Sequence, residues 1–142
     1  MIDRVCPCIL MTHSQSGPQG LRAALRRPNL VKAYISVEPA GFAIPAGESA
    51  ATLANVPILT VFGDYVGQNP GDPAVGWLNS AQNTTTLVNA AGGNASVLVL
   101  PDQGIIGNTH MMMMDNNNEQ IADLIETWIQ NNVPGVKGKY KP

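Results

Sequence analysis

Short runs of apolar and β-branched residues recur along the chain and alternate with more polar stretches. The apolar runs lie at residues 8–12, 31–39, 57–64 and 95–101. An unbroken apolar run of this length is typical of a strand that is buried on both faces, as in a parallel sheet covered by helices. The pattern therefore predicts about four buried strands.

The segments between these runs carry helix and turn signals. Residues 19–27 have a helical composition, and residues 74–92 form a helical stretch that Gly92 and Gly93 close. A last helix before Pro134 is predicted by a stripe with spacings of three and four, made of Ile121, Leu124, Ile125, Trp128 and Ile129. Residues 40–56 predict an excursion over the sheet with one short helix, and residues 65–73 predict a turn. Alternating strands and helices predict an α/β fold with a parallel sheet and right-handed crossovers.

Length and composition narrow the class of protein. A chain of 142 residues indicates a single domain, here residues 1–142, and 44% hydrophobic with 13% charged residues suits a helix-covered sheet. The net charge of −2 gives no electrostatic footprint for nucleic acid. The sequence contains no run of about 18 apolar residues, so no membrane span is expected. Residues 1–10 do not resemble a signal peptide, because Asp3 and Pro7 interrupt them. The compartment is left open.

The sequence contains two cysteines, Cys6 and Cys8. If both belong to the first strand they share a face, and a bridge between them is not expected. Two thiolates alone make a poor zinc site. We therefore expect free, buried thiols, and we expect no metal and no cofactor.

Candidate chemistry gathers after the predicted strands. In a parallel α/β sheet, ligands bind at the carboxyl ends of the strands. Ser14 follows the first strand, Glu38 the second, Asp64 the third and His110 the fourth. A nucleophile, an acid and a base in that chain order match the order of an α/β-hydrolase triad.

Two serines compete for the role of nucleophile. A strand-to-helix turn needs small residues two positions before and after the nucleophile, and Thr12 and Ser16 satisfy this around Ser14. Centring the turn on Ser16 would put Pro18 at a crowded position. We therefore prefer Ser14. His13 is expected to pack beside the turn rather than act as a base, which leaves His110 as the general base.

The residues alone leave the acid open. Its role is to hold the imidazole in one tautomer and to stabilise the imidazolium that forms. Glu38 and Asp64 both stand at strand ends. Either carboxylate satisfies the pattern.

Four segments together resemble a branch of the α/β-hydrolase esterases. They are ILMTHSQSGP (9–18), VKAYISVEP (31–39), PILTVFGD (57–64) and GNTHMMMMDNNN (107–118). In that branch the acid follows the strand after the nucleophile, so the resemblance implies a triad of Ser14, His110 and Glu38, with Asp64 as the alternative acid. It also implies an acyl-enzyme mechanism on a small-molecule ester, and an oxyanion donor at the amide of Gln15.

The resemblance covers only the second half of the α/β-hydrolase fold. We therefore expect a partial fold, truncated at the N-terminus, in which residues 1–5 are the end of the helix before the nucleophile strand. The loop that donates a second oxyanion hydrogen bond would lie in the absent half. An exposed edge at the first strand would favour self-association. Residues 42–45 and the methionines at 111–114 are candidates for an apolar acyl pocket.

Overall fold

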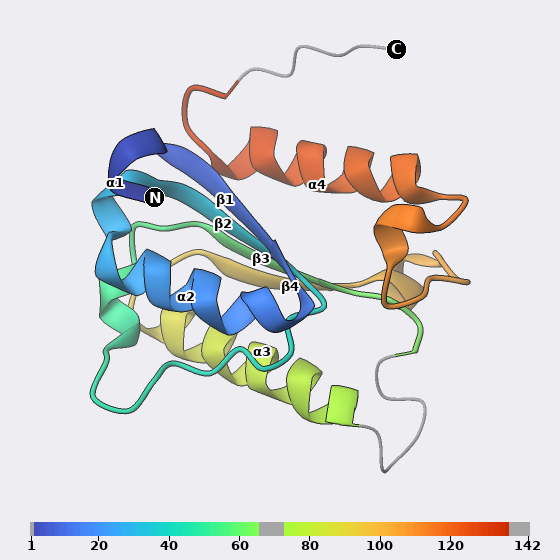
Figure 1. The fold of residues 1–142 in the computed structure, drawn as a ribbon, viewed down its shortest axis with the longest axis horizontal. Helices are drawn as coiled ribbons and strands as arrows, with labels where there is room; N and C mark the ends of the chain where they lie inside the picture. The colour runs from blue at the N-terminus through green and yellow to red at the C-terminus, as the bar shows by residue number, and fades with distance from the viewer. Residues whose placement is uncertain (1, 66–72, 137–142) are drawn as a thin grey trace.

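The computed structural model describes residues 2–65 and 73–136, and within them four strands form one sheet. All neighbouring pairs are parallel, and the order is β1-β2-β3-β4 (Figure 1). The strands are β1 (Cys8–His13), β2 (Val31–Val37), β3 (Ile58–Phe62) and β4 (Ala95–Val99). The predicted set of four parallel strands is thus confirmed, but the expectation that all four are buried is wrong, because β1 and β4 are edge strands and are only partly buried. Strand β1 lies at one edge of the sheet and β4 at the other.

Helices cover both faces of this sheet. Helices α2 (Gly17–Arg26) and α3 (Pro73–Ala90) pack on one face, and α4 (Asn118–Asn132) packs on the other (Figure 1). A short α1 (Ile2–Val5) precedes β1, in line with the expected helix end at residues 1–5. The turn predicted at 65–73 lies almost wholly outside the described residues. Among the described residues, none of the helices combines the length and the apolar character needed to cross a membrane.

Single turns of 3₁₀ helix connect these elements. They are η1 (Ser14–Ser16), η2 (Pro28–Leu30), η3 (Ala50–Leu53), η4 (Leu100–Gln103) and η5 (Met112–Met114). The short helix expected within residues 40–56 corresponds to η3. The connection between β1 and α2 is short, because it consists of η1 alone and η1 passes directly into α2. This tight turn is where the sequence predicts the nucleophile.

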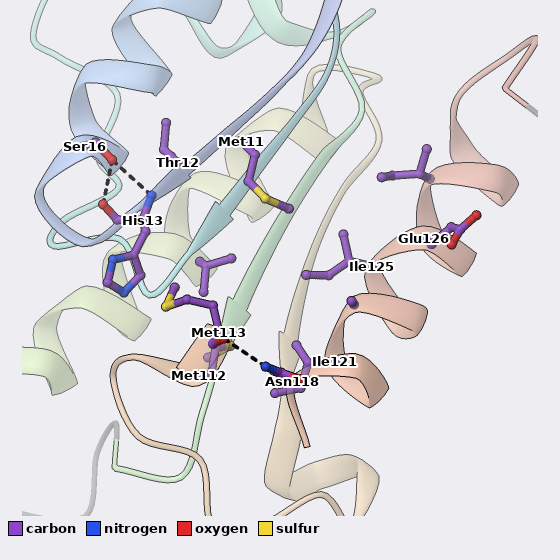
Figure 2. A pocket seen from close by; sticks show the side chains of 13 residues that line it. Met11, Thr12, His13, Ser16, Met112, Met113, Asn118, Ile121, Ile125 and Glu126 are labelled. Carbon is purple, nitrogen blue, oxygen red and sulfur yellow. Dashed lines mark hydrogen bonds between the residues drawn. The ribbon is translucent and has the colours of Figure 1, made fainter. Parts of the chain in front are cut away.

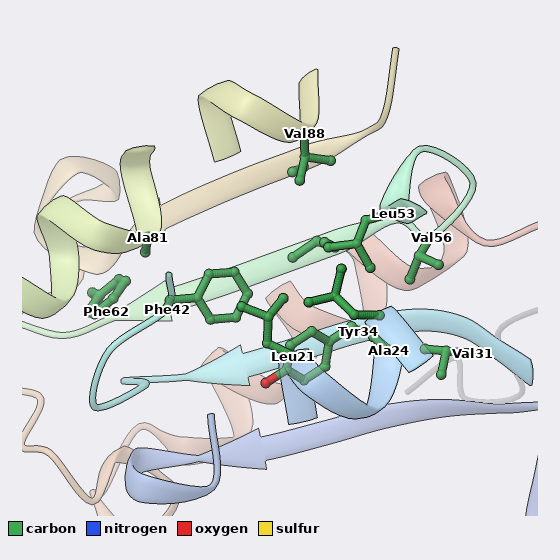
Figure 3. Packing of buried hydrophobic residues seen from close by; sticks show 13 residues of the cluster. Leu21, Ala24, Val31, Tyr34, Phe42, Leu53, Val56, Phe62, Ala81 and Val88 are labelled. Carbon is green, nitrogen blue, oxygen red and sulfur yellow. The ribbon is translucent and has the colours of Figure 1, made fainter. Parts of the chain in front are cut away.

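The larger core cluster lies between the sheet and helices α2 and α3 (Figure 3). Tyr34 and Phe42 are fully buried in it, and their rings stack with centroids 5.7 Å apart. Ile44 packs against the same cluster. The expectation that Phe42 and Ile44 line an acyl pocket is therefore wrong, because the 40–56 excursion folds these side chains inward.

The second core cluster lies under α4. Ile121 and Ile125 of the predicted stripe are buried there against Ile35 and Leu59 of the sheet. Leu124, Trp128 and Ile129 are partly buried at the margin of this cluster. The stripe therefore identified the face of α4 that packs on the sheet.

Two glycines let α2 approach the sheet closely. A Cβ on Gly17 would lie 2.4 Å from Cβ of Pro39, and a Cβ on Gly20 would lie 2.6 Å from Cγ2 of Thr12 and 2.6 Å from the hydroxyl of Tyr34. Contacts below 3.0 Å require something to move. These positions hold the start of α2 directly against the turn that follows β1.

The expectation of free cysteines is wrong. Cys6 and Cys8 form a disulfide with their Cα atoms 4.4 Å apart, a spacing at the lower end of the range for disulfides. The argument against a bridge placed both residues on one strand. Strand β1 begins only at Cys8, and Cys6 belongs to the connection from α1.

Candidate active site

The ends of β1 and β2 place Ser14 and Glu38 side by side. His13 and Val37 are register partners, and Ser14 and Glu38 are the residues that directly follow them. Both have positive φ, 54° for Ser14 and 43° for Glu38, and within the described residues they alone do so among non-glycine residues. Such backbone is costly for non-glycine residues and is concentrated at functional sites.

His110 lies between these two side chains. Its Nε2 is 2.8 Å from Oγ of Ser14, and its Nδ1 is 2.7 Å from Oε2 of Glu38. With Nδ1–H donating to the carboxylate, Nε2 is left to accept the hydroxyl proton of the serine. Ser14, His110 and Glu38, the acid that the family resemblance implied, thus form a continuous hydrogen-bonded chain.

Glu38 is held rigidly and away from solvent. Its side chain is 4% exposed, against 39% for that of His110. Its second oxygen, Oε1, accepts the backbone amide of Gly63 at 2.7 Å. A Cβ at Gly63 would lie 3.1 Å from this oxygen, so the absence of a side chain lets the strand end approach the carboxylate. Both oxygens of the buried carboxylate therefore have a partner.

Asp64, the alternative acid, has a different set of partners. Its Oδ2 accepts the amide of Gly107 at 2.6 Å, and its Oδ1 accepts the amide of Asn108 at 3.2 Å. These amides belong to the loop that carries His110. Asp64 therefore contacts the backbone of this loop, whereas Glu38 contacts the imidazole.

His13 packs beside the turn at residues 14–16, as the sequence predicted. Its Nε2 donates a hydrogen bond of 2.7 Å to the backbone carbonyl of His110, and the two imidazole centroids are 4.6 Å apart. The indole ring of Trp77, from α3, also packs against the imidazole of His110, with the ring centroids 5.7 Å apart. These contacts restrict where the imidazole of His110 can lie.

Side chains of β1 and β2 contact the turn at residues 14–16 and the start of α2. The Tyr34 hydroxyl donates to the carbonyl of Gly17 at 2.6 Å and lies 2.8 Å from Oγ1 of Thr12. Burial raises the pKa of Tyr34, so the phenol stays protonated and able to donate. Ser16, the rival nucleophile, is used differently. Its hydroxyl donates to the carbonyl of His13 and accepts the amide of the same residue.

An apolar cavity of about 450 Å³ opens next to this turn, between β1 and α4 (Figure 2). His13 and Ser16, which flank Ser14, form part of its wall. Met112 and Met113 from the predicted methionine run line it, together with Met11 and Ile125. A cavity of this size and character can hold a small apolar group. Among residues 2–65 and 73–136, no cluster of three or more His, Cys, Asp or Glu side chains is placed to hold a metal ion.

Two features of the site were missed from the sequence. One is the positive φ of Glu38, for which the adjacent Pro39 and Gly41 were only an indirect signal. The other is a polar network around the His110 loop, in which Asp115 accepts the amide of Thr109 at 2.7 Å. The asparagine-rich segment 115–118 was the available signal for this network.

The comparisons with known proteins point to lipases and esterases. No protein-family model matches the chain. The chain is 30% identical over 173 residues to the probable secreted lipase phiG of Fungal sp. (strain ATCC 74256), covering 92% of this chain and 48% of the lipase. It is 38% identical, with a TM-score of 0.78, to the structure of a novel bacterial esterase, covering 87% of this chain and 38% of that one.

Two further structures share the fold at low identity. A predicted CIB-like hydrolase from Thermoplasma acidophilum is 14% identical with a TM-score of 0.58, covering 91% of this chain and 53% of that one. A thermostable esterase is 16% identical with a TM-score of 0.50, covering 82% and 30% respectively. The chain spans about half the length of the curated lipase.

Proposed function

Because the chain forms part of an α/β-hydrolase fold and is similar in sequence to an esterase and a lipase, we propose that it is a serine hydrolase of carboxylic esters. Ser14 is the nucleophile, His110 the general base and Glu38 the acid. The observation that carries this proposal is the hydrogen-bonded chain from Ser14 Oγ through His110 to Glu38, with distances of 2.8 Å and 2.7 Å.

The first half of the reaction acylates Ser14. Nε2 of His110 takes the hydroxyl proton as Oγ forms a bond to the ester carbonyl carbon. The tetrahedral intermediate then collapses, the bond to the alcohol oxygen breaks, and His110 returns the proton to the leaving alcohol. The acyl group stays on Ser14.

The second half releases the acid. His110 removes a proton from a water molecule, whose oxygen attacks the acyl carbonyl carbon. Collapse of this intermediate breaks the bond to Ser14 Oγ, and the proton on His110 returns to the serine. Glu38 keeps Nδ1 protonated throughout and stabilises the imidazolium in each half. A buried carboxylate with both oxygens hydrogen-bonded suits that role.

The backbone amide of Gln15 is the proposed oxyanion donor. Gln15 directly follows Ser14 within η1, the position from which this fold supplies one donor. Preorganised donors of this type are each worth a factor of about a hundred to a thousand in rate. In α/β-hydrolases the second donor is an N–H of the loop between the third strand and the first helix of the full fold.

Covalent labelling tests the proposal directly. The purified chain is treated with a fluorophosphonate probe, and the modified peptide is mapped by mass spectrometry. We expect one label, on Ser14, and no labelling of Ser14→Ala or His110→Ala. Ser49→Ala is the matched control, because Ser49 is exposed and only caps η3. A folded chain that never labels would contradict the proposal.

A second candidate function is a hydrolase-like binding module or inactive fragment that acts only with further polypeptide. The sheet edge at β1 favours it. Met11 on this strand is 54% exposed. Cavities open on both sides of β1, one of about 450 Å³ toward α4 and one of about 550 Å³ toward α2. An open apolar edge invites pairing with another strand, including that of a second copy.

Solution behaviour separates the two candidates. Light scattering after size-exclusion chromatography reports self-association, and circular dichroism reports folding. Active monomers favour the chain as a sufficient hydrolase. A soluble, folded chain without labelling favours the binding module. Insolubility that is cured by co-expressing the uncovered part of the esterase relative favours a fragment that needs that part.

A further inference from the structure

His110 is carried by a loop with little regular structure of its own. The loop runs from the end of η4 to the start of η5, and it contains two glycines in left-handed backbone, Gly104 at φ 72° and Gly107 at φ 91°. Ile106 is 73% exposed on it. Something other than helix or strand hydrogen bonds must therefore fix the imidazole within the narrow limits that proton transfer requires.

One dipeptide at the end of β3 contacts both the acid and this loop. The amide of Gly63 donates to Glu38, and the carboxylate of the next residue, Asp64, accepts the amides of Gly107 and Asn108. Glu38 and the loop that carries His110 are thus both held by two adjacent residues that directly follow β3. Glu38 and His110 are 72 positions apart in the sequence, so the local backbone does not fix their relative position.

The far side of the loop is held by a second carboxylate. Asp115 accepts the amide and the hydroxyl of Thr109, at 2.7 Å and 3.0 Å. Asn108, between these contacts, is fully buried, and its side-chain amide donates to Asn117 at 2.7 Å. The amides of residues 107, 108 and 109 are consequently all bound to carboxylate oxygens, immediately before His110. Hydrogen bonds to ionised acceptors are stronger than neutral ones.

We propose that Asp64 is a positioning residue for the triad, which acts by holding the backbone of the His110 loop against the strand end that holds Glu38. The inference rests on the proposed function. It assigns a role to the carboxylate that the sequence offered as the alternative acid. Asp64 does not exchange a proton with substrate, and its charge serves two backbone amides.

Asp64→Asn is the sharpest variant, because it keeps the shape of the side chain. The amide group offers one acceptor oxygen and places an NH₂ group opposite the second backbone N–H, so one of the two bonds is lost. We expect kcat per active site to fall about tenfold to a hundredfold, the range for a misplacement of about 1 Å, with KM little changed. Asp123→Asn, an exposed aspartate of α4, is the control for loss of one charge.

Active sites are counted by burst titration with a fluorophosphonate, so that unfolded protein does not lower the apparent kcat. A purely structural role for Asp64 predicts fewer active sites and a lower melting temperature, with unchanged kcat per site. That result would overturn the proposal. A loss as large as that of Glu38→Gln would also overturn it, because it would make Asp64 the acid.

A spectroscopic readout does not depend on turnover. We expect the Nδ1 proton between His110 and Glu38 to give a strongly deshielded proton resonance, and the chain has only one other histidine, which simplifies the assignment. In Asp64→Asn we expect this resonance to broaden and to exchange faster with water than in Asp123→Asn. An unchanged resonance contradicts the positioning role. If the parent never labels, the proposed function fails while this measurement still tests Asp64.

Asp64→Glu covers the case in which Asp64→Asn does not fold. The charge is retained, but the carboxylate is displaced by one methylene group from the two amides. We expect an intermediate loss of kcat per site and partial broadening of the shared proton. Parental values in both measurements for Asp64→Glu would contradict the requirement for this geometry.

Discussion

Glu38 lies 2.7 Å from Nδ1 of His110 and accepts the amide of Gly63 through its other oxygen. The carboxylate is almost completely buried, so both of its oxygens have exchanged water for a fixed partner. A buried charge is tolerated only when it is paired and hydrogen-bonded. The end of β2 is therefore built around this one side chain, and removal of its charge should affect chemistry more than binding.

Glu38→Gln should lower kcat by about ten-thousandfold. The side chain of glutamine retains an oxygen for Gly63, but its amide group faces Nδ1 and favours the wrong imidazole tautomer. KM should change little, because Glu38 does not contact the substrate in the proposed mechanism. Steady-state kinetics on a p-nitrophenyl ester measures both quantities. Equal activity of parent and variant would remove Glu38 from the triad.

Two helical glycines should respond in opposite ways to alanine. In Gly20→Ala the new Cβ would lie 2.6 Å from Thr12 and Tyr34, and we expect a loss of about 1–3 kcal/mol in the free energy of unfolding. In Gly76→Ala the Cβ meets nothing within 4 Å, and we expect a gain of up to about 1 kcal/mol. Urea unfolding measures both. A Gly20→Ala variant as stable as the parent would contradict the close approach of α2 to β1.

The order of strands and helices could be predicted because a strand that is buried on both faces appears in the sequence as a short apolar run. Each strand of a helix-covered sheet is an apolar run, so 31–39 and 57–64 marked β2 and β3 to within two residues at each end. The stripe at 121–129 marked the packed face of α4 for the same reason. These signals depend on neighbours along the chain rather than on distant contacts.

The candidate site could be predicted only in part. Carboxyl ends of parallel strands share one edge, which brought Ser14, Glu38 and His110 together in expectation. The structure places these side chains in contact, and their catalytic roles stay predictions. The choice between Glu38 and Asp64 came from family resemblance, because both follow strands and the residues alone do not fix which carboxylate reaches the imidazole.

Other features depend on contacts that no local pattern records. The Cys6–Cys8 bridge depends on β1 beginning at Cys8 rather than earlier. The burial of Phe42 depends on the path of the 40–56 excursion over Tyr34. The contacts of Asp64 depend on how a loop more than 40 residues later lies on the end of β3.

Tyr34→Phe should destabilise the chain by about 1–3 kcal/mol. The variant loses two hydrogen bonds of a fully buried hydroxyl, to the carbonyl of Gly17 at 2.6 Å and to Oγ1 of Thr12 at 2.8 Å, and each such bond contributes about 0.5–1.5 kcal/mol. Urea unfolding measures the difference. Tyr65→Phe is the matched control, because Tyr65 is 57% exposed and its hydroxyl has access to water. Equal stabilities for the two variants would contradict the role of the Tyr34 hydroxyl under the nucleophile turn.

Asp115 should make the stability of the His110 loop depend on pH. The amide hydrogen bond from Thr109 is the main cause that holds the pKa of Asp115 below its usual 3.8, with the Thr109 hydroxyl and Asn108 adding to it against the opposing effect of burial. A carboxyl whose pKa is lowered on folding stabilises the folded state above its unfolded pKa, and this contribution is lost as the pH falls through the lowered value.

Parent and Asp115→Asn should therefore differ in free energy of unfolding by a constant amount from about pH 7 to about pH 5. Below about pH 4 the two curves should converge, and the hydrogen-exchange protection factor of the Thr109 amide should fall in the parent over the same interval. A difference that persists unchanged to about pH 2, or one that grows as the pH falls, would show that the ionised carboxylate does not hold this loop.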